Sequence, residues 1–169
     1  MAVNEMKTEK NDRTAGKKGT TSNGTEILWF NVGEVVYGIE IKYINEIIGI
    51  DNTTVIPKIP EYIKGVINIR GKVVPVISIR RRFGIEEIPY DDRTCIIVLE
   101  FDNGMQQVGV IVDRVREVDV VSSSLITQTP NYQNVNQNRY IKNIIENRQE
   151  GEEVKLLLDC EKLIWEGIA

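Results

Sequence analysis

An internal repeat is the feature of this sequence that most limits its fold. When Gly38 is placed on Gly109, Glu46 falls on Glu117 with no gap between them. The same alignment pairs aliphatic residues at four more positions: Ile39 with Val110, Ile41 with Val112, Ile44 with Val115 and Ile47 with Val118. Agreement at glycine and acidic positions, as well as at apolar ones, indicates a tandem duplication.

Each copy consists of short β-branched segments separated by turns. Ile27 to Val32 and Val35 to Ile41 predict a first hairpin, and Thr94 to Phe101 with Gln107 to Val112 predict its counterpart. Within Tyr43 to Ile48 the isoleucines have a near-helical spacing. The hairpin of the first copy is thus followed by an apolar segment that leads toward its next strands.

A second hairpin follows in the first copy. Gly65 to Ile69 and Lys72 to Ile79 are β-branched runs that meet at Arg70-Gly71, and an X-Gly pair between two such runs predicts a tight turn. In the second copy Tyr140 to Ile145 and Val154 to Leu158 replace these runs, but the segment between them is longer and acidic. The arginine tip is therefore expected in one copy only.

A short helix is expected after the last strand of each copy. Ser78 is the predicted N-cap of a helix over Ile79 to Phe83, and Asp159 that of a helix over Glu161 to Trp165. The first helix carries Arg80-Arg81-Arg82, whose charges are expected to be solvated or paired locally.

The number and length of the strands predict the architecture. Five short strands do not form a stable flat sheet, so each copy is expected to curl into a small barrel. The sequence therefore predicts a mainly β domain over residues 25–169, made of two five-stranded barrels packed side by side. The barrels are adjacent or intertwined, with about 25–88 in one and 89–169 in the other, and the C-terminal helix packs on the first.

The segment from Met1 to Gly24 differs from the rest of the chain. It is polar and almost free of apolar residues, so it is predicted to be disordered. Because it also lacks the apolar stretch of a secretory signal, we expect a cytoplasmic protein. Its five basic and three acidic residues give a net charge of +2, so that the whole-chain charge of −4 leaves −6 for the other residues. An acidic body argues against nucleic acid as the main partner.

Composition also limits the chemistry. The chain contains no histidine, which removes histidine-based catalysis, phosphohistidine relays and the common zinc sites. Cys95 and Cys160 are expected to be buried thiols, because their spacing fits neither a metal site nor a cytoplasmic disulfide. Glu46 and Glu117, at the same repeat position, are expected to share a role at a barrel rim and not to form a catalytic pair. No enzyme activity, cofactor or metal is predicted.

Three segments together resemble one known family. Ile63 to Val76 carries the pattern I-x-G-V-x-N-x-R-G-x-x-x-P-V. The other two segments are Asn45 to Gly49 and Gly109 to Val115. This combination is similar to the CheW family, the coupling proteins of bacterial chemotaxis, over essentially Glu26 to Ala169. The resemblance implies two SH3-like barrels and an adaptor without chemistry of its own. The implied partners are the cytoplasmic tips of methyl-accepting chemotaxis receptors and the regulatory domain of the histidine kinase CheA, in arrays at the membrane without membrane insertion.

The resemblance also implies two binding surfaces. The receptor-binding positions that it implies are Leu28, Ile41, Ile44, Glu46, Ile47, Arg70 and Val112. Candidate kinase-binding positions in the second copy are Asp102, Asn103, Gly104, Val115 and Val118.

Physical reasoning supports a receptor site and leaves alternatives open. A groove that accepts a helix needs aliphatic anchors and a polar rim, which Ile44, Ile47, Glu46 and Arg70 can supply. Ile44 and Ile47 can equally be core residues, and Arg70 can be a solvated turn residue. The alternative function is a small β-barrel protein that binds nucleic acid, which the acidic body disfavours.

Overall fold

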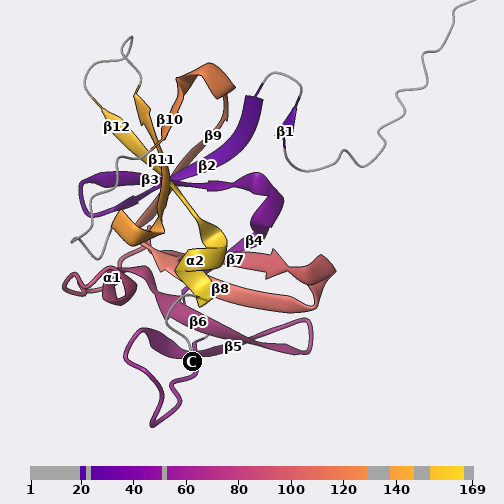
Figure 1. Cartoon of the computed structure of the whole chain (residues 1–169). Helices are drawn as coiled ribbons and strands as arrows, with labels where there is room; N and C mark the ends of the chain where they lie inside the picture. Colours follow the sequence, from indigo (N-terminus) through magenta and orange to yellow (C-terminus); the bar gives the residue numbers. More distant parts are fainter. Residues whose placement is uncertain (1–19, 22–23, 51–52, 129–137, 147–152, 166–169) are drawn as a thin grey trace, which may run out of the picture.

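The computed structural model describes residues 20–21, 24–50, 53–128, 138–146 and 153–165, and most of them lie in β-strands (Figure 1). The strands are β1 Thr20–Thr21, β2 Gly24–Val32, β3 Val35–Glu40, β4 Ile44–Gly49, β5 Ile63–Ile69, β6 Lys72–Ser78, β7 Cys95–Phe101, β8 Gln106–Val112, β9 Arg114–Val121, β10 Ile126–Gln128, β11 Ile141–Glu146 and β12 Val154–Leu158. The helices are α1 Ile79–Arg82 and α2 Cys160–Trp165, with 3-10 turns η1 Ile41–Tyr43, η2 Asp102–Gly104, η3 Ser123–Leu125 and η4 Asn138–Tyr140. The predicted mainly β fold is confirmed.

The strands form two sheets. One runs in the order β1-β2-β3-β12-β11-β10, with β9 also paired to β2, and we call it barrel 1. Five longer strands make up most of barrel 1, and β1 and β10 add two and three residues at its ends. The other sheet runs β4-β7-β8-β6-β5, and we call it barrel 2.

The two copies of the repeat exchange strands. Barrel 2 takes β4, β5 and β6 from the first copy and β7 and β8 from the second, and barrel 1 has the reciprocal composition. Neither 25–88 nor 89–169 therefore forms a complete barrel by itself. The exchange explains the two parallel pairings, β6 with β8 and β12 with β3, because each joins the last strand of one copy to the second strand of the other.

Three apolar clusters follow from this arrangement. Barrel 1 encloses a small cluster around Trp29, and barrel 2 encloses another around Val76. The largest cluster lies between the barrels and includes Phe30 and Tyr37 from barrel 1 and Ile97 and Val110 from barrel 2. Part of the outer face of each sheet is thus buried against the other, and the barrels share one extended core.

The segment with near-helical spacing is a strand. β4 pairs with β7 from Ile44 opposite Leu99 to Gly49 opposite Cys95, with a bulge between Ile44 and Glu46. Pairing with a buried strand thus overrides the local pattern. The bulge leaves one residue unpaired and places Ile44 and Ile47 on the same outer face of barrel 2.

The central hairpin has the predicted form. β5 and β6 pair from Ile63 opposite Ile77 to Ile69 opposite Lys72, leaving a two-residue turn at Arg70 and Gly71. Both turn residues have positive φ, 50° and 83°, as a type I′ turn requires.

The ends of the helices and of the chain agree in part with expectation. The hydroxyl of Ser78 accepts a hydrogen bond from the backbone N–H of Arg81, and the carboxylate of Asp159 accepts one from that of Lys162, as predicted for N-caps.

Thr20 and Thr21 pair with Thr25 and Gly24, so the prediction of disorder up to Gly24 is wrong at this strand. Residues 1–19 and 22–23, and the acidic turn near 147–152, lie outside the described residues. Both cysteines are free thiols: Cys160 is buried and Cys95 half-buried.

The repeated glycine has a packing role that can be tested. A Cβ on Gly38 would lie 2.6 Å from Cε3 of Trp29 and 2.6 Å from Cγ2 of Ile27, both fully buried. We expect Gly38→Ala to lower the free energy of unfolding by about 2 kcal/mol through overpacking. Urea unfolding followed by Trp29 fluorescence measures this, and Val35→Ala on the exposed start of β3 is the control. Equal midpoints for both variants would contradict the proposed close contact.

Candidate partner-binding surface

The hairpin tip lies beside Glu46 at the mouth of barrel 2. Glu46 and Ile48 share the inner face of this barrel with their partners Val98 and Ile96. The guanidinium of Arg70 lies 3.5 Å from the Glu46 carboxylate, although β4 and β5 are at opposite ends of the sheet order. This ion pair therefore closes the mouth of barrel 2.

Barrel 1 has an equivalent ion pair, but its cationic side chain is buried, whereas that of barrel 2 is exposed. Glu117, the repeat counterpart of Glu46, lies 3.5 Å from the ammonium of Lys155. Lys155 is buried and also lies 5.0 Å from the ring centre of Trp29. The Arg70 side chain, in contrast, is 77% exposed. Both acidic positions pair with a cation, but only in barrel 2 is that cation exposed.

The implied receptor residues divide by burial. Ile47 follows Glu46 in sequence and is 45% exposed on the outer face of barrel 2. The other aliphatic members, Leu28, Ile41, Ile44 and Val112, are buried in the core between the barrels or packed against it. Leu28 and Val112 are buried and help to hold the two barrels together, whereas Ile41 is half-buried and Ile44 lines a surface pocket. The assignment of these four residues to a receptor surface stays a prediction.

The implied kinase residues lie on two separate elements. Asp102, Asn103 and Gly104 form the turn between β7 and β8, and all three have positive φ. On β9, Val115 packs against the core between the barrels, whereas Val118 is exposed. Val118 is thus the counterpart of Ile47 in both repeat position and exposure.

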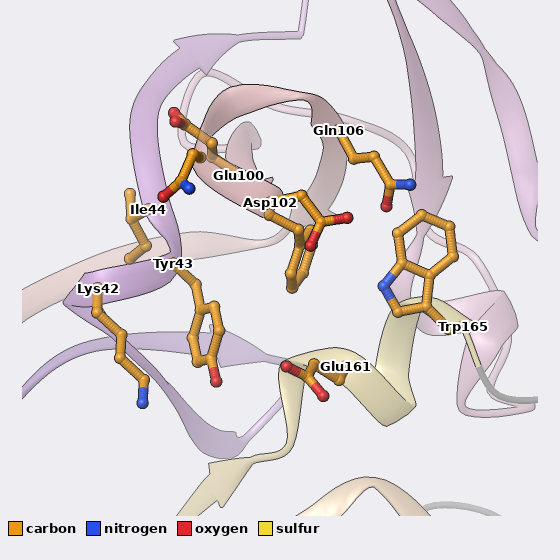
Figure 2. A pocket seen from close by; sticks show the side chains of 10 residues that line it. Lys42, Tyr43, Ile44, Glu100, Asp102, Gln106, Glu161 and Trp165 are labelled. Atoms are coloured by element: carbon orange, nitrogen blue, oxygen red, sulfur yellow. The ribbon is translucent and has the colours of Figure 1, made fainter.

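A pocket of about 600 Å³ lies between η1, the turn η2 and helix α2 (Figure 2). Figure 2 shows Lys42 and Tyr43 on one side and Trp165 with Gln106 on the other. Phe101 lies 5.7 Å from the Tyr43 ring and 5.9 Å from the Trp165 ring, so the three rings form a row. The sequence patterns gave no indication of this pocket, because its lining comes from three distant segments.

A partly buried ion pair joins the two barrels near α1. Arg80 donates two hydrogen bonds to the Asp113 carboxylate, from Nε at 3.0 Å and from Nη2 at 2.6 Å. The same carboxylate accepts a hydrogen bond from the backbone N–H of Gly33, at the β2–β3 turn of barrel 1. The first arginine of the Arg80–Arg82 run is therefore a structural clamp. Arg81, which pairs with Glu87 at 2.8 Å, is the locally paired arginine that the sequence predicts.

Burial alone would raise the pKa of Asp113. The hydrogen bonds from Arg80 and Gly33, together with the Arg80 charge, outweigh burial and hold the pKa of this carboxyl below its ordinary value. The carboxylate therefore stays ionised across the neutral range.

The described residues contain no group of three or more acidic or cysteine side chains that could hold a metal ion. None of the described helices is long and apolar enough to cross a membrane.

The fold and its surface first define a class, a pair of strand-exchanged β-barrels around a common core with an arginine-tipped hairpin on one barrel. The CheW-like domain model matches residues 26–166, and the chain belongs to this family of chemotaxis scaffold proteins.

Individual relatives agree with this assignment. The chain is 36% identical over 151 residues to the chemotaxis protein CheW of Klebsiella aerogenes, covering 89% of this chain and 88% of that protein. It is 34% identical over 117 residues to CheW of Rhizobium meliloti, covering 69% and 74%. The crystal structure of the scaffolding protein TtCheW from Thermoanaerobacter tengcongensis aligns with a TM-score of 0.73 at 29% identity, covering 83% of this chain and 92% of that one.

Proposed function

We propose that this protein is a non-catalytic adaptor that joins the cytoplasmic tips of chemoreceptors to the histidine kinase CheA. Family membership supports the role in chemotaxis. The observation that carries the receptor part of the proposal is the exposed Arg70 on a tight turn beside Ile47 and Glu46. The protein would accordingly act at receptor arrays on the membrane.

The proposed receptor surface consists of Arg70, Glu46 and Ile47. Ile47 supplies an exposed aliphatic anchor, and the two charged residues supply a polar rim, which suits one face of a receptor helix. Oε1 of Glu46 is buried and has no hydrogen-bond partner among the described residues. A donor on a receptor helix would satisfy this atom, while Arg70 turns to a receptor carboxylate or to the carbonyls at a helix end.

The proposed kinase surface is on barrel 1 and the turn of η2. Val118 offers the same exposed aliphatic position there that Ile47 offers on barrel 2. Asp102 to Gly104 form an exposed turn whose conformation is held by the hydrogen bond from the Met105 N–H to the Asp102 carbonyl. The strand exchange gives the two surfaces related geometry, so one adaptor can hold two different partners at once.

Arg70→Glu provides the sharpest test of the receptor surface. We expect this variant to bind a receptor-tip fragment roughly 30-fold more weakly, because loss of a central arginine anchor costs about 2 kcal/mol. Isothermal titration calorimetry measures the change, and Arg93→Glu, on the connector between α1 and β7, is the matched charge control. Equal affinities for Arg70→Glu and the unaltered protein would place the receptor surface elsewhere.

Chemical-shift mapping tests the adaptor role as a whole. The full chain is titrated separately with the receptor-tip fragment and with the CheA regulatory domain. We expect two sets of shifted residues, one around Ile47 and Arg70 and one around Val118 and the η2 turn. If neither partner produced shifts, the adaptor proposal would be wrong.

A further inference from the structure

The two repeats of this chain complete each other's barrels. We call β1 to β6 with α1 the first repeat, and β7 to β12 with α2 the second repeat. Four pairings of the described strands cross between them: β2 with β9, β3 with β12, β4 with β7 and β6 with β8. Arg80 also bonds Asp113 across this boundary, and Nε of Arg82 donates a hydrogen bond of 2.9 Å to the carbonyl of Leu163. A first repeat therefore closes its barrels only with a second repeat as its partner.

One connector joins the two repeats. It runs over residues 84–94, all of them described, and contains no helix or strand. Ser78 at the end of β6 and Cys95 at the start of β7 pair with Ile111 and Val112 on the two edges of β8, so these strand ends lie about 10 Å apart. An extended chain of this length spans up to about 36 Å, well beyond that gap. The connector is thus long enough to lead either back to its own second repeat or across to that of a neighbouring molecule.

Ion pairs and a turn hold the two ends of the connector. The carboxylate of Glu87 lies 2.9 Å from the ammonium of Lys64 and 2.8 Å from the guanidinium of Arg81, both in the first repeat. At the other end, the side chain of Asp91 accepts a hydrogen bond of 3.2 Å from the backbone N–H of Thr94, next to β7. Each end would keep these contacts if the chain between them changed its course.

The middle of the connector, residues 88–90, has the properties of a hinge. Ile88 and Tyr90 are 47% and 46% exposed. No hydrogen bond joins Ile88, Pro89 or Tyr90 to any other residue in the described part of the chain. Because a proline disfavours helical backbone at the residue before it, Ile88 is also biased toward an extended conformation. Straightening this segment therefore breaks no hydrogen bond.

We propose that this chain forms a strand-exchanged dimer with a second molecule of itself, in which residues 88–90 act as the hinge. The first repeat of each molecule packs with the second repeat of the other. Each two-barrel unit of the dimer keeps all the contacts between the repeats, so the dimer differs from two monomers only at the hinges and in the freedom lost on association. The proposal concerns two molecules of this chain and is independent of the receptor and kinase partners.

The covalent connection favours the monomer when the protein is dilute. The connector holds the two repeats of one molecule at an effective concentration of the order of millimolar. Chains that refold well below this concentration therefore close on themselves, and chains that refold near it also pair with each other. Converting one form into the other requires the repeats to separate, which amounts to unfolding both barrels. A dimer that has formed should therefore persist after dilution.

Refolding of the full chain at two concentrations tests the dimer. The protein is unfolded in urea, refolded at about 10 μM or about 1 mM, and then diluted to one common concentration. Size-exclusion chromatography with light scattering measures the fraction of dimer. We expect this fraction to be roughly tenfold larger after refolding at the higher concentration, and to remain unchanged during a day at the lower one. Monomer alone in both samples would overturn the proposal, and so would a dimer that dissociates on dilution, because its molecules would then be packed side by side.

Charge reversal across the two repeats tests the exchange itself. Arg80→Asp and Asp113→Arg each bring like charges together when the chain closes on itself. In an exchanged dimer of the two variants, one unit has the original pair and the other has the reversed pair. We expect an equimolar mixture refolded together to contain about five times more dimer than either variant alone, because only mixing removes both repulsions. A chain with both substitutions should refold as a monomer, and it reports whether the reversed pair is tolerated.

A second pair of variants is the matched control. Lys64 and Glu87 also form an ion pair, but both precede the hinge and so stay together on one chain. Mixing Lys64→Glu with Glu87→Lys should therefore give no more dimer than either variant alone. If mixing the Arg80 and Asp113 variants gave no greater gain than this control, the exchange would be disproved. If the chain with both substitutions did not fold, the refolding of the unaltered protein at two concentrations would decide alone.

Discussion

Asp113→Asn is expected to lower the free energy of unfolding by about 3 kcal/mol, because it leaves the guanidinium of Arg80 mostly buried and without its counter-charge. The side chains of Arg80 and Asp113 are only 15% and 20% exposed, and two hydrogen bonds join them. The substitution also weakens the link to Gly33 in barrel 1. For a chain of this size the unfolding midpoint should fall by roughly 6 to 12 °C.

The effect has a defined pH dependence. The pKa of Asp113 in the folded protein lies below its ordinary value, so the unfolded chain binds the proton more readily as pH falls. The stability that Asp113 contributes is therefore complete above the unfolded pKa of about 4 and is lost as pH falls through the folded value. Thermal unfolding of both proteins across pH 3 to 7 should show their midpoints converging at the acidic end.

A matched control separates this clamp from ordinary surface pairs. Arg116 and Glu153 also form an ion pair, 2.7 Å apart, but the Glu153 side chain is 46% exposed. Glu153→Gln should change the free energy of unfolding by no more than about 0.5 kcal/mol. If Asp113→Asn were as mild as Glu153→Gln, the clamp between the barrels would contribute nothing beyond a surface pair.

Much of the fold could be predicted because local patterns decide it. The β5–β6 hairpin follows from two β-branched runs around Arg70-Gly71, and the positive φ values of the turn explain why glycine stands there. The repeat predicted two barrels because matching residues recur at matching spacing. Gly38 and Gly109 illustrate the physical basis, since a side chain at either position would collide with a buried neighbour inside its barrel.

The strand exchange could not be predicted from the same patterns. β3 has the same apolar alternation whether it pairs with β6 of its own copy or with β12 of the other. Both arrangements bury the same side chains, so periodicity does not distinguish them. The choice depends on long-range packing, including the core between the barrels and the Asp113 clamp.

Which residues of the candidate site are buried could not be predicted from the sequence either. Ile44 and Ile47 are three residues apart, and both fit an aliphatic anchor or a core position. The bulge at the start of β4 puts them on one face, but barrel 1 covers only the first of them. The pocket was missed for a related reason, because Tyr43, Asp102 and Trp165 meet only through the packing of η1, η2 and α2.

Aspartate substitutions at these two isoleucines should therefore have opposite consequences. Ile44 is 9% exposed and packed in the core between the barrels. Ile44→Asp buries a carboxylate with no partner and removes apolar contacts, so we expect a loss of about 4 kcal/mol or more and partial unfolding at room temperature. Ile47 is 45% exposed, and Ile47→Asp should change stability by no more than about 0.5 kcal/mol.

Receptor binding should separate the same two variants in the opposite way, because only Ile47 lies on the proposed receptor surface. Ile47→Asp places a charge on the proposed receptor surface and should weaken binding of a receptor-tip fragment about tenfold, while leaving the circular dichroism spectrum and unfolding midpoint intact. Ile44→Asp should lose binding only in proportion to its unfolded fraction, which urea unfolding measures independently. A folded Ile44→Asp with normal stability would show that the core between the barrels is open at this position. A fully active Ile47→Asp would remove Ile47 from the receptor surface while leaving the role of Arg70 to its own test.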